Sequence, residues 1–238
     1  MLCRLSPPDD LSPVFAPFAA GTPERPFVVA QIGQSLDGRV ATVSGDSKYI
    51  NGATALDHLH RVRAHVDAVV VGVGTVVADD PMLTVRRVDG ASPARVVIDP
   101  RGRLPEGAQC LRDDGVRRCV VRATVAETPE QEGVETIALA AVDARLCPRD
   151  IVAELGRRGF ARILIEGGPR TISAFLDAGA LDRLHVLVAP LLIGSGKAAL
   201  DLAPVDTLAQ ARRPACRVYP MTDGDALFDC DLRAEDPR

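Results

Sequence analysis

The chain has 238 residues, 47% of them hydrophobic and 25% charged, which is ordinary for a globular protein long enough to bury a substantial core. The net charge of −4 and the pI of about 5.6 exclude the overall basic charge that marks nucleic-acid-binding domains. No run of about 18 apolar residues occurs, so we expect no membrane span and a cytoplasmic location. The six cysteines lack metal-ligand spacing, which predicts reduced thiols and no bound metal.

The first 26 residues contain six prolines and show no hydrophobic period, which predicts an irregular arm before a single domain over 27–238. The elements expected next are a strand (26–33), a loop rich in Gly, Ser and Asp (34–52), a helix (53–66), a strand buried on both faces (67–74) and a helical turn that stops before Pro81.

The second half of the chain continues this alternation. The expected elements are three strands (94–100, "RRCVVRA" and "VETIAL"), a helix (149–159), a strand–Gly-Gly–helix unit (161–184), a strand (184–194) and an antiparallel hairpin around "DGD" (216–232). Strands that alternate with helices predict an α/β fold in which helices flank a mostly parallel sheet. Sheets of this kind bind ligands at the carboxyl ends of their strands.

The segment "ILIEGGPRTISAFL" places Glu166 at a strand end, followed by two glycines and a helix that begins near Pro169. Glycines at this place let backbone amides approach an anion, and the start of the helix adds partial positive charge. A tight turn with a solvated Glu166 would produce the same pattern. The segment by itself leaves both interpretations open.

The segment "VADDPMLTVRR" holds two adjacent carboxylates, Asp79 and Asp80, of which at most one faces a site. A carboxylate at a reacting centre can orient a ring or handle a proton, whereas an Asp-Asp-Pro loop also serves structure alone. Arg63 ends the predicted helix 53–66, where a cation offsets the helix dipole. The four histidines have no nucleophile or metal partner in the sequence and are expected to be core or surface residues.

Five segments taken in order resemble the reductase domain of riboflavin biosynthesis, the C-terminal half of a bifunctional deaminase–reductase. The resemblance covers about 27 to 230 and is carried by "QIGQSLDGRVATVSGDSKYING", "VGVGTVVADDPMLTVRR", "RVVIDPRGRLP", "ILIEGGPRTISAFL" and "VAPLLIGSG". It implies a dihydrofolate-reductase-like fold, a homodimer, NADPH as the cofactor and a pyrimidine ribosylamine 5′-phosphate as the substrate, whose ribosyl group is reduced to ribitol.

The resemblance also implies roles for particular residues. Cofactor contacts are expected at Gly33, Tyr49, Thr75, Asp79, Gly167, Gly168, Pro169, Arg170, Thr171, Ile172, Ser173 and Ala174. Substrate contacts are expected at Ser47, Arg63, Leu83, Arg86 and Glu166, and catalytic roles at Asp79 and Glu166. Two forked cations, Arg63 and Arg86, suit a sugar phosphate. For the cofactor's 2′-phosphate, the "DPRGR" segment offers Arg101 or Arg103.

The sequence departs from the family in three places. Neither HxE nor PCxxC, the zinc deaminase signatures, occurs, so we expect no deamination. Tyr49 stands where many members have tryptophan, and the proline-rich arm lies outside the family pattern. Two other functions stay open, a reductase of another heterocycle such as a dihydropterin or dihydrofolate and a non-catalytic nucleotide-binding member. The sequence does not choose between a deaminated and an undeaminated pyrimidine.

Overall fold

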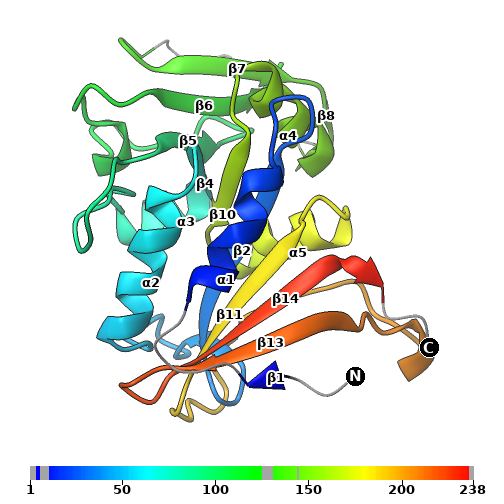
Figure 1. Cartoon of the computed structure of the whole chain (residues 1–238). Coiled ribbons are helices and arrows are strands. Elements are labelled where there is room, and N and C mark those ends of the chain that lie inside the picture. The colour runs from blue at the N-terminus through cyan, green and yellow to red at the C-terminus, as the bar shows by residue number, and fades with distance from the viewer. Residues whose placement is uncertain (1–3, 6–10, 125–130, 144, 236–238) are drawn as a thin grey trace.

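A ten-stranded sheet organises the computed structural model, which describes residues 4–5, 11–124, 131–143 and 145–235 (Figure 1). Its strand order is β1-β13-β14-β11-β2-β10-β4-β5-β6-β7. The strands are β1 (Arg4–Leu5), β2 (Phe27–Ser35), β4 (Ala68–Gly72), β5 (Ala94–Ile98), β6 (Arg118–Ala123), β7 (Glu135–Leu139), β10 (Arg162–Glu166), β11 (Arg183–Ala189), β13 (Pro214–Pro220) and β14 (Ala226–Glu235).

The strands from β11 to β7 pair in parallel along the sheet, and β14 joins β11 and β13 in antiparallel fashion. The predicted α/β class, the mostly parallel sheet and the C-terminal antiparallel hairpin are therefore confirmed. Two small antiparallel pairs join β3 (Arg39–Ala41) to β12 (Lys197–Ala198) and β8 (Ala141–Val142) to β9 (Arg145–Leu146).

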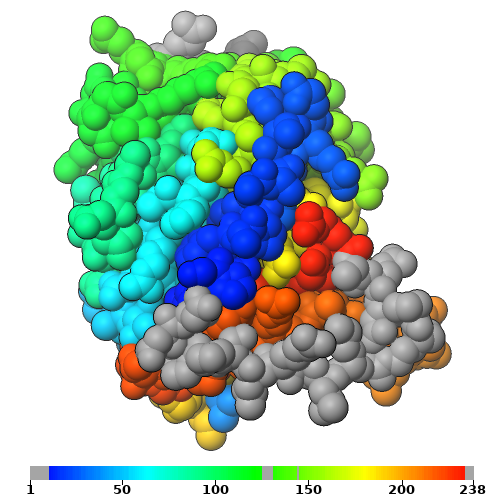
Figure 2. Space-filling view, viewed as in Figure 1, coloured from blue at the N-terminus to red at the C-terminus, as the bar shows by residue number. Residues whose placement is uncertain are grey.

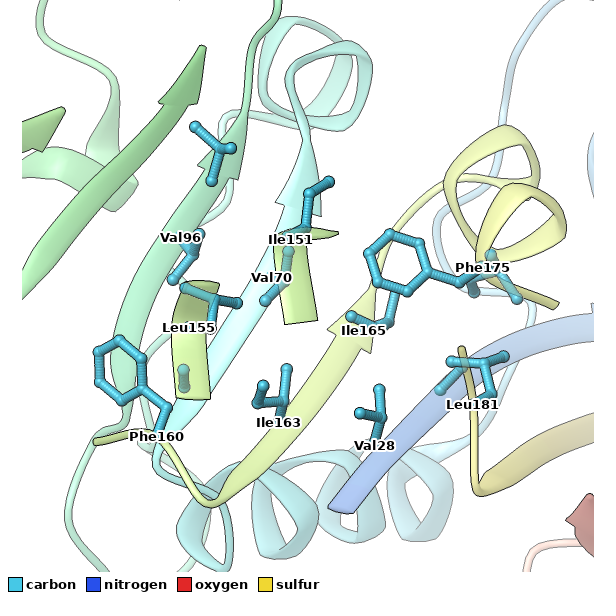
Figure 3. Packing of buried hydrophobic residues seen from close by; sticks show 14 of the residues in the cluster. Val28, Val70, Val96, Ile151, Leu155, Phe160, Ile163, Ile165, Phe175 and Leu181 are labelled. Carbon is cyan, nitrogen blue, oxygen red and sulfur yellow. The ribbon is translucent and has the colours of Figure 1, made fainter. Parts of the chain in front are cut away.

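Helices cover both faces of the sheet. One face carries α2 (Ala53–Ala64), α3 (Val73–Asp79) and the 3-10 turn η2 (Gln109–Leu111). The other face carries α4 (Pro148–Arg157) and α5 (Pro169–Asp177), and Figure 3 shows Ile151, Leu155 and Phe175 of these helices packed on the strands. The strands between are buried on both sides, which explains their continuous apolar runs. A 3-10 turn, η3 (Leu208–Gln210), precedes β13.

The tip of the C-terminal hairpin holds the start of α2. Asp223 Oδ2 accepts the Thr54 N–H at 2.8 Å, and Asp225 Oδ2 accepts the Gly52 N–H at 2.9 Å. These carboxylates satisfy amides that the first turn of a helix leaves without partners and favour its positive end. The helix therefore begins where a distant hairpin caps it.

The prediction of an irregular arm is wrong for residues 12–20. They form α1 (Ser12–Phe15) and the 3-10 turn η1 (Ala16–Ala20), and both Val14 and Phe18 are buried. The Phe18 ring lies 5.2 Å from the Phe27 ring and 6.4 Å from His185. Figure 2 shows this blue segment as a band between the cyan residues of α2 and the orange and red C-terminal strands. The prolines thus bound a short helical piece that covers the core.

Replacement of Phe18 by alanine is expected to lower the free energy of unfolding by about 3 kcal/mol, because it removes a buried ring and leaves a cavity. Denaturant unfolding measures this loss. Leu208→Ala is the matched control, since its side chain is 79% exposed and its removal should change the stability by less than about 0.5 kcal/mol. Equal stabilities for the two variants would mean that the N-terminal segment does not support the domain.

Candidate active site

The carboxyl ends of β10 and β4 bring the predicted site residues together. Glu166 is the last residue of β10 and lies in register with Gln31 of the neighbouring β2. Gly72 ends β4 and leads directly into α3. This edge of the sheet is the expected place for a ligand in a parallel α/β fold.

Arg63 and Glu166 form a forked ion pair at this edge. The Arg63 Nε donates to Glu166 Oε2 at 2.8 Å, and its Nη2 donates to Glu166 Oε1. The Arg63 Nη1 donates to the Thr84 carbonyl at 2.9 Å. The two side chains are only 5% and 18% exposed. The structure thus joins two of the expected substrate contacts to each other, which fixes the orientation of the Glu166 carboxylate.

The loop after α3 is tied to α2 by several hydrogen bonds. Besides the Arg63 bond to Thr84, the Arg86 N–H donates to His60 Nδ1 at 3.0 Å, and Arg87 Nε donates to Asp57 Oδ1 at 2.7 Å. Leu83 has a φ of +57°, and the whole residue is only 1% exposed, so the structure leaves little of it open to a ligand. The Arg86 side chain is exposed, and within the described residues its guanidinium has no hydrogen bond or ion pair. Arg86 is therefore the open cation of this group.

The pKa of His60 is affected by the positive charges around it. Burial of its ring, together with Arg63 and Arg86, lowers the pKa of His60 from 6.5 to about 4. The imidazole is therefore neutral near pH 7, and its Nδ1 stays free to accept the Arg86 N–H. Sequence reasoning placed the four histidines in core or surface roles and missed this contact.

The stability of the protein should fall as the pH drops from about 6.5 to about 4, and His60→Gln should remove part of this fall. Below pH 6.5 the unfolded chain protonates His60 while the folded chain does not, so protons favour unfolding. The loss is fully present below the folded pKa and absent above 6.5. We expect a contribution of about 3 kcal/mol between pH 7.5 and pH 4, measured by urea unfolding of both proteins. Parallel curves for wild type and variant would contradict this assignment.

Two helix N-termini meet beside this group. The Gly168 N–H donates to Thr75 Oγ1 at 3.0 Å, which links the start of α5 to the start of α3. Gly72 approaches Thr171 so closely that an added Cβ would collide with the Thr171 hydroxyl. Two helix starts side by side concentrate partial positive charge and unpaired amides, which suits a diphosphate.

No backbone angle or close contact among the described residues requires a glycine at position 167 or 168. Neither Gly167 nor Gly168 adopts a positive φ, and an added Cβ would come no closer than 3.7 and 3.5 Å to other atoms, which is ordinary contact. A side chain at either position would instead enter the space in front of the two helix starts. Space of this kind in front of two helix starts is what an anionic ligand would need to reach the backbone amides.

Of the other residues expected to contact the cofactor, some have exposed side chains and others are buried or already hydrogen-bonded. Arg170 and Ala174 are exposed on α5, and Pro169 occupies its first turn. Ile172 is fully buried in the core, and the Ser173 hydroxyl accepts the Asp201 N–H at 2.9 Å. The structure therefore gives the side chains of Ile172 and Ser173 structural roles in place of cofactor contacts.

Asp79 and Asp80 have different surroundings, as the sequence predicted. The Asp80 Oδ1 accepts the Gln109 N–H at 2.8 Å and its Oδ2 accepts the Gln109 side-chain amide at 3.0 Å, and these bonds lower the pKa of Asp80. Asp79 is exposed at the end of α3, and no bond to its carboxylate occurs among the described residues. Asp79 is thus the one of these two carboxylates that is not held by protein groups in the described residues.

The segment 33–52 holds the remaining expected contacts. Gly33 lies on β2, where an added Cβ would displace the end of the Asn51 side chain, so packing gives one reason for a glycine there. Ser47 is half-buried, whereas Tyr49 is 81% exposed. Tyr49 therefore forms no wall against other protein groups.

Sequence reasoning missed two polar residues near the site. Gln31 is 5% exposed, and its Oε1 makes no hydrogen bond to any described residue. Asp37 accepts the Ser35 hydroxyl at 2.6 Å and the amides of Ile193 and Gly194, which lower its pKa to about 2. Asp37 thus joins the segment "SLDG" to the segment "LLIGSG". The only feature of the sequence that could have indicated this contact is the frequent Gly and Asp in the two loops.

Among the residues described, no group of three His, Cys, Asp or Glu side chains is arranged to hold a metal ion. In the same part of the chain, no helix is long and apolar enough to cross a membrane.

Known proteins share this fold and these segments. The chain is 34% identical over 199 residues to the 2,5-diamino-6-ribosylamino-4(3H)-pyrimidinone 5′-phosphate reductase of Methanothermobacter thermautotrophicus, which covers 79% of this chain and 90% of the relative. It is 35% identical over 185 residues to the riboflavin biosynthesis protein RibD of Aquifex aeolicus, which covers 76% of this chain. The chain spans 51% of that relative's length, about half.

A solved structure gives the same result. The diaminohydroxyphosphoribosylaminopyrimidine deaminase/5-amino-6-(5-phosphoribosylamino)uracil reductase of Thermotoga maritima matches with a TM-score of 0.74 and 28% identity, over 92% of this chain and 60% of that one. Acinetobacter baumannii RibD matches with a TM-score of 0.73 and 32% identity, over 87% and 58%. The model of the family described as the RibD C-terminal domain matches residues 26–218. The chain therefore belongs to the RibD C-terminal domain family.

Proposed function

We propose that this protein is an NADPH-dependent reductase that converts the ribosyl group of a pyrimidine ribosylamine 5′-phosphate to ribitol. The observation that carries the proposal is the juxtaposition of an open guanidinium, Arg86, a fixed carboxylate, Glu166, and the glycine-lined space before α3 and α5. A phosphorylated sugar and a dinucleotide need these groups side by side. The name of the Methanothermobacter relative supports the substrate class.

In this proposal the α3–α5 junction holds the cofactor's diphosphate. Thr75 and Gly168 are joined to each other, so the amides at both helix starts keep one arrangement. The exposed Arg170 lies in the first turn of α5 beside this space, and Asp79, exposed at the far end of α3, is assigned to the cofactor side by the resemblance alone. When bound, the cofactor supplies a hydride to C1′ of the ring-opened sugar.

The substrate side is formed by Arg86, Glu166 and the loop between α3 and β5. Arg86 binds the 5′-phosphate, because its fork is open and its backbone is held by His60. Glu166 accepts a hydrogen bond from the ribosyl hydroxyls or the ring amine and sets the distance between C1′ and the cofactor.

The test is NADPH oxidation with four candidate acceptors. These are the deaminated and undeaminated pyrimidine ribosylamine 5′-phosphates, dihydrofolate and a dihydropterin. We expect turnover with one or both pyrimidines and none with the other two, because a pterin has no phosphate for Arg86. Turnover with dihydrofolate or dihydropterin alone would overturn the proposal. Binding of NADPH without turnover of any acceptor would support a nucleotide-binding member instead.

We also propose a homodimer of 25.2 kDa subunits. Leu36, Leu191 and Leu192 are 63%, 43% and 71% exposed, and the Leu36 N–H donates to the Leu191 carbonyl at 2.8 Å, so they form one apolar surface. Light scattering should give twice the subunit mass, and Leu192→Glu should reduce it to one. A monomer mass for the wild type would contradict this.

A further inference from the structure

Two cysteines face each other on neighbouring strands of the C-terminal hairpin. Cys216 of β13 pairs in register with Cys230 of β14, and the Cys230 thiol donates to the Cys216 sulfur at 3.7 Å. The two sulfurs are therefore in contact without a covalent bond between them. Both lie on strands outside the group of residues to which the proposed function assigns a role.

The hydrogen-bond pattern of the hairpin brings the two backbones close at this point. Pairs in an antiparallel ladder alternate between hydrogen-bonded and non-hydrogen-bonded types. At the turn, the Met221 N–H donates to the Asp225 carbonyl at 2.8 Å, which makes these two residues a hydrogen-bonded pair, and the adjacent Pro220 has no N–H to donate. The register is unbroken from there to Cys216 and Cys230, an odd number of positions away, so the cysteines form a non-hydrogen-bonded pair. Such pairs have Cα atoms about 4.5 Å apart, which a disulfide can span.

The surroundings of the cysteines make this pair the reactive one on the sheet. Cys216 and Cys230 are half-buried, so a small reagent can reach them. Cys110 and Cys119, in contrast, are fully buried, and burial raises the pKa of each thiol to about 11. Because the thiolate is the reactive form of cysteine, these two thiols are expected to be inert near pH 7.

We propose that Cys216 and Cys230 form a reversible disulfide by exchange with a low-molecular-weight disulfide of the glutathione type. One of the two cysteines attacks the small disulfide and releases one small thiol, and the other, already in contact, attacks the mixed disulfide and releases the second. The S–S bond of the reagent breaks as the bond between Cys216 and Cys230 forms. Two electrons pass from the protein to the reagent, and the two protons of the cysteines end on the two small thiols.

A bridge at this position would act on a helix of the candidate site. The tip of the same hairpin holds the start of α2 through Asp223 and Asp225, and α2 carries Arg63, the partner of Glu166. A cross-link between the strands limits opening of the hairpin and restricts the unfolded chain. The oxidised protein should therefore be more stable and hold the first turn of α2 more firmly.

The experiment places the whole chain in glutathione buffers that range from fully reduced to fully oxidised. The proteins are wild type, Cys216→Ser, Cys230→Ser and the matched control Cys147→Ser, whose native cysteine is exposed at the start of α4. Remaining thiols are blocked with a maleimide in denaturant and mapped by mass spectrometry. Wild type and Cys147→Ser should yield peptides joined through Cys216 and Cys230, and excess thiol should separate them. Each single variant at the pair should instead hold glutathione on the remaining cysteine.

The physical consequence is measured on the same samples. Oxidation should raise the melting temperature of wild type by roughly 5 °C and slow hydrogen exchange of the amides at the start of α2. Cys216→Ser, treated in the same way, should show neither change. Absence of the Cys216–Cys230 linkage in fully oxidised wild type, or a linkage through Cys147 or Cys3 in its place, would overturn the inference. Cys3 lies outside the described residues. Equal melting temperatures and exchange rates in the two redox states would overturn the effect on α2.

Discussion

Gly168→Val should abolish NADPH binding and leave the fold intact. Gly168 adopts φ −67° and ψ 163°, an extended conformation that valine accepts readily, and an added Cβ lies 3.5 Å from the nearest atom, Thr75 Oγ1. The branched side chain would fill the space before α3 and α5, which the glycines leave open. A ligand whose phosphates must reach the backbone amides there would be excluded.

Calorimetric titration of NADPH and thermal unfolding together measure this prediction. We expect more than roughly a hundred-fold loss of affinity with a change in melting temperature of only a few degrees. Ala153→Val is the matched control, since Ala153 is exposed on α4 and the same side chain there meets no proposed ligand. Unchanged affinity in Gly168→Val would mean that Gly167 and Gly168 serve the turn alone.

The architecture could be predicted because hydrophobic periods and turn residues report it directly. The apolar runs of β4, β5 and β10 are typical of strands covered on both faces, and the structure covers them. The hairpin at 216–232 followed from alternation around "DGD". These patterns are local in the sequence, so they can be interpreted without knowing which elements pack against each other.

The buried face of α2 shows where local signals fail. The hydrophobic period predicted a helix here from its apolar residues alone, yet His58, His60 and Arg63 are also buried on it. Burial of these polar side chains depends on partners far along the chain, such as His185, Arg86 and Glu166. The residues near them in the sequence do not predict these contacts.

The prediction for the N-terminal segment was wrong for a related reason. Its prolines were interpreted as signs of irregular chain, but Pro13 and Pro17 occupy first-turn positions of α1 and η1, where a missing N–H costs little. Phe18 becomes ordered only because the surface formed by Phe27 and His185 receives it. A segment that folds onto others carries no period of its own.

The sequence named candidate residues for the site, but it could not predict how they pair with one another. The resemblance named Arg63, Arg86 and Glu166 as equal contacts to a phosphorylated substrate. The structure separates them, because Arg63 spends its Nε and Nη2 donors on Glu166 and its Nη1 on Thr84. Only Arg86 keeps an open fork among these described residues. The two arginines should therefore behave differently when each is removed.

Arg86→Ala should raise KM for the phosphorylated substrate by roughly ten- to a hundred-fold and leave NADPH affinity unchanged, because one charge-assisted contact to the 5′-phosphate is lost. Removal of the phosphate from the substrate should cause the same loss in wild type and no further loss in Arg86→Ala. Arg87→Ala is the matched control. Its guanidinium is exposed and bound to Asp57 at 2.7 Å, so its removal should have little effect on KM.

Arg63→Ala should instead lower the free energy of unfolding by about 3 kcal/mol, because it strands the carboxylate of Glu166 in a largely buried place. Its effect on kcat/KM should be the same for substrates with and without phosphate, since it acts through Glu166 and the Thr84 carbonyl. Glu166→Gln in the Arg63→Ala background should restore part of the stability, as the stranded charge is gone. Turnover of both substrates would stay low, because the oriented carboxylate is still missing. A phosphate-dependent loss in Arg63→Ala equal to that in Arg86→Ala would show that the ion pair opens on substrate binding and that both arginines grip the phosphate.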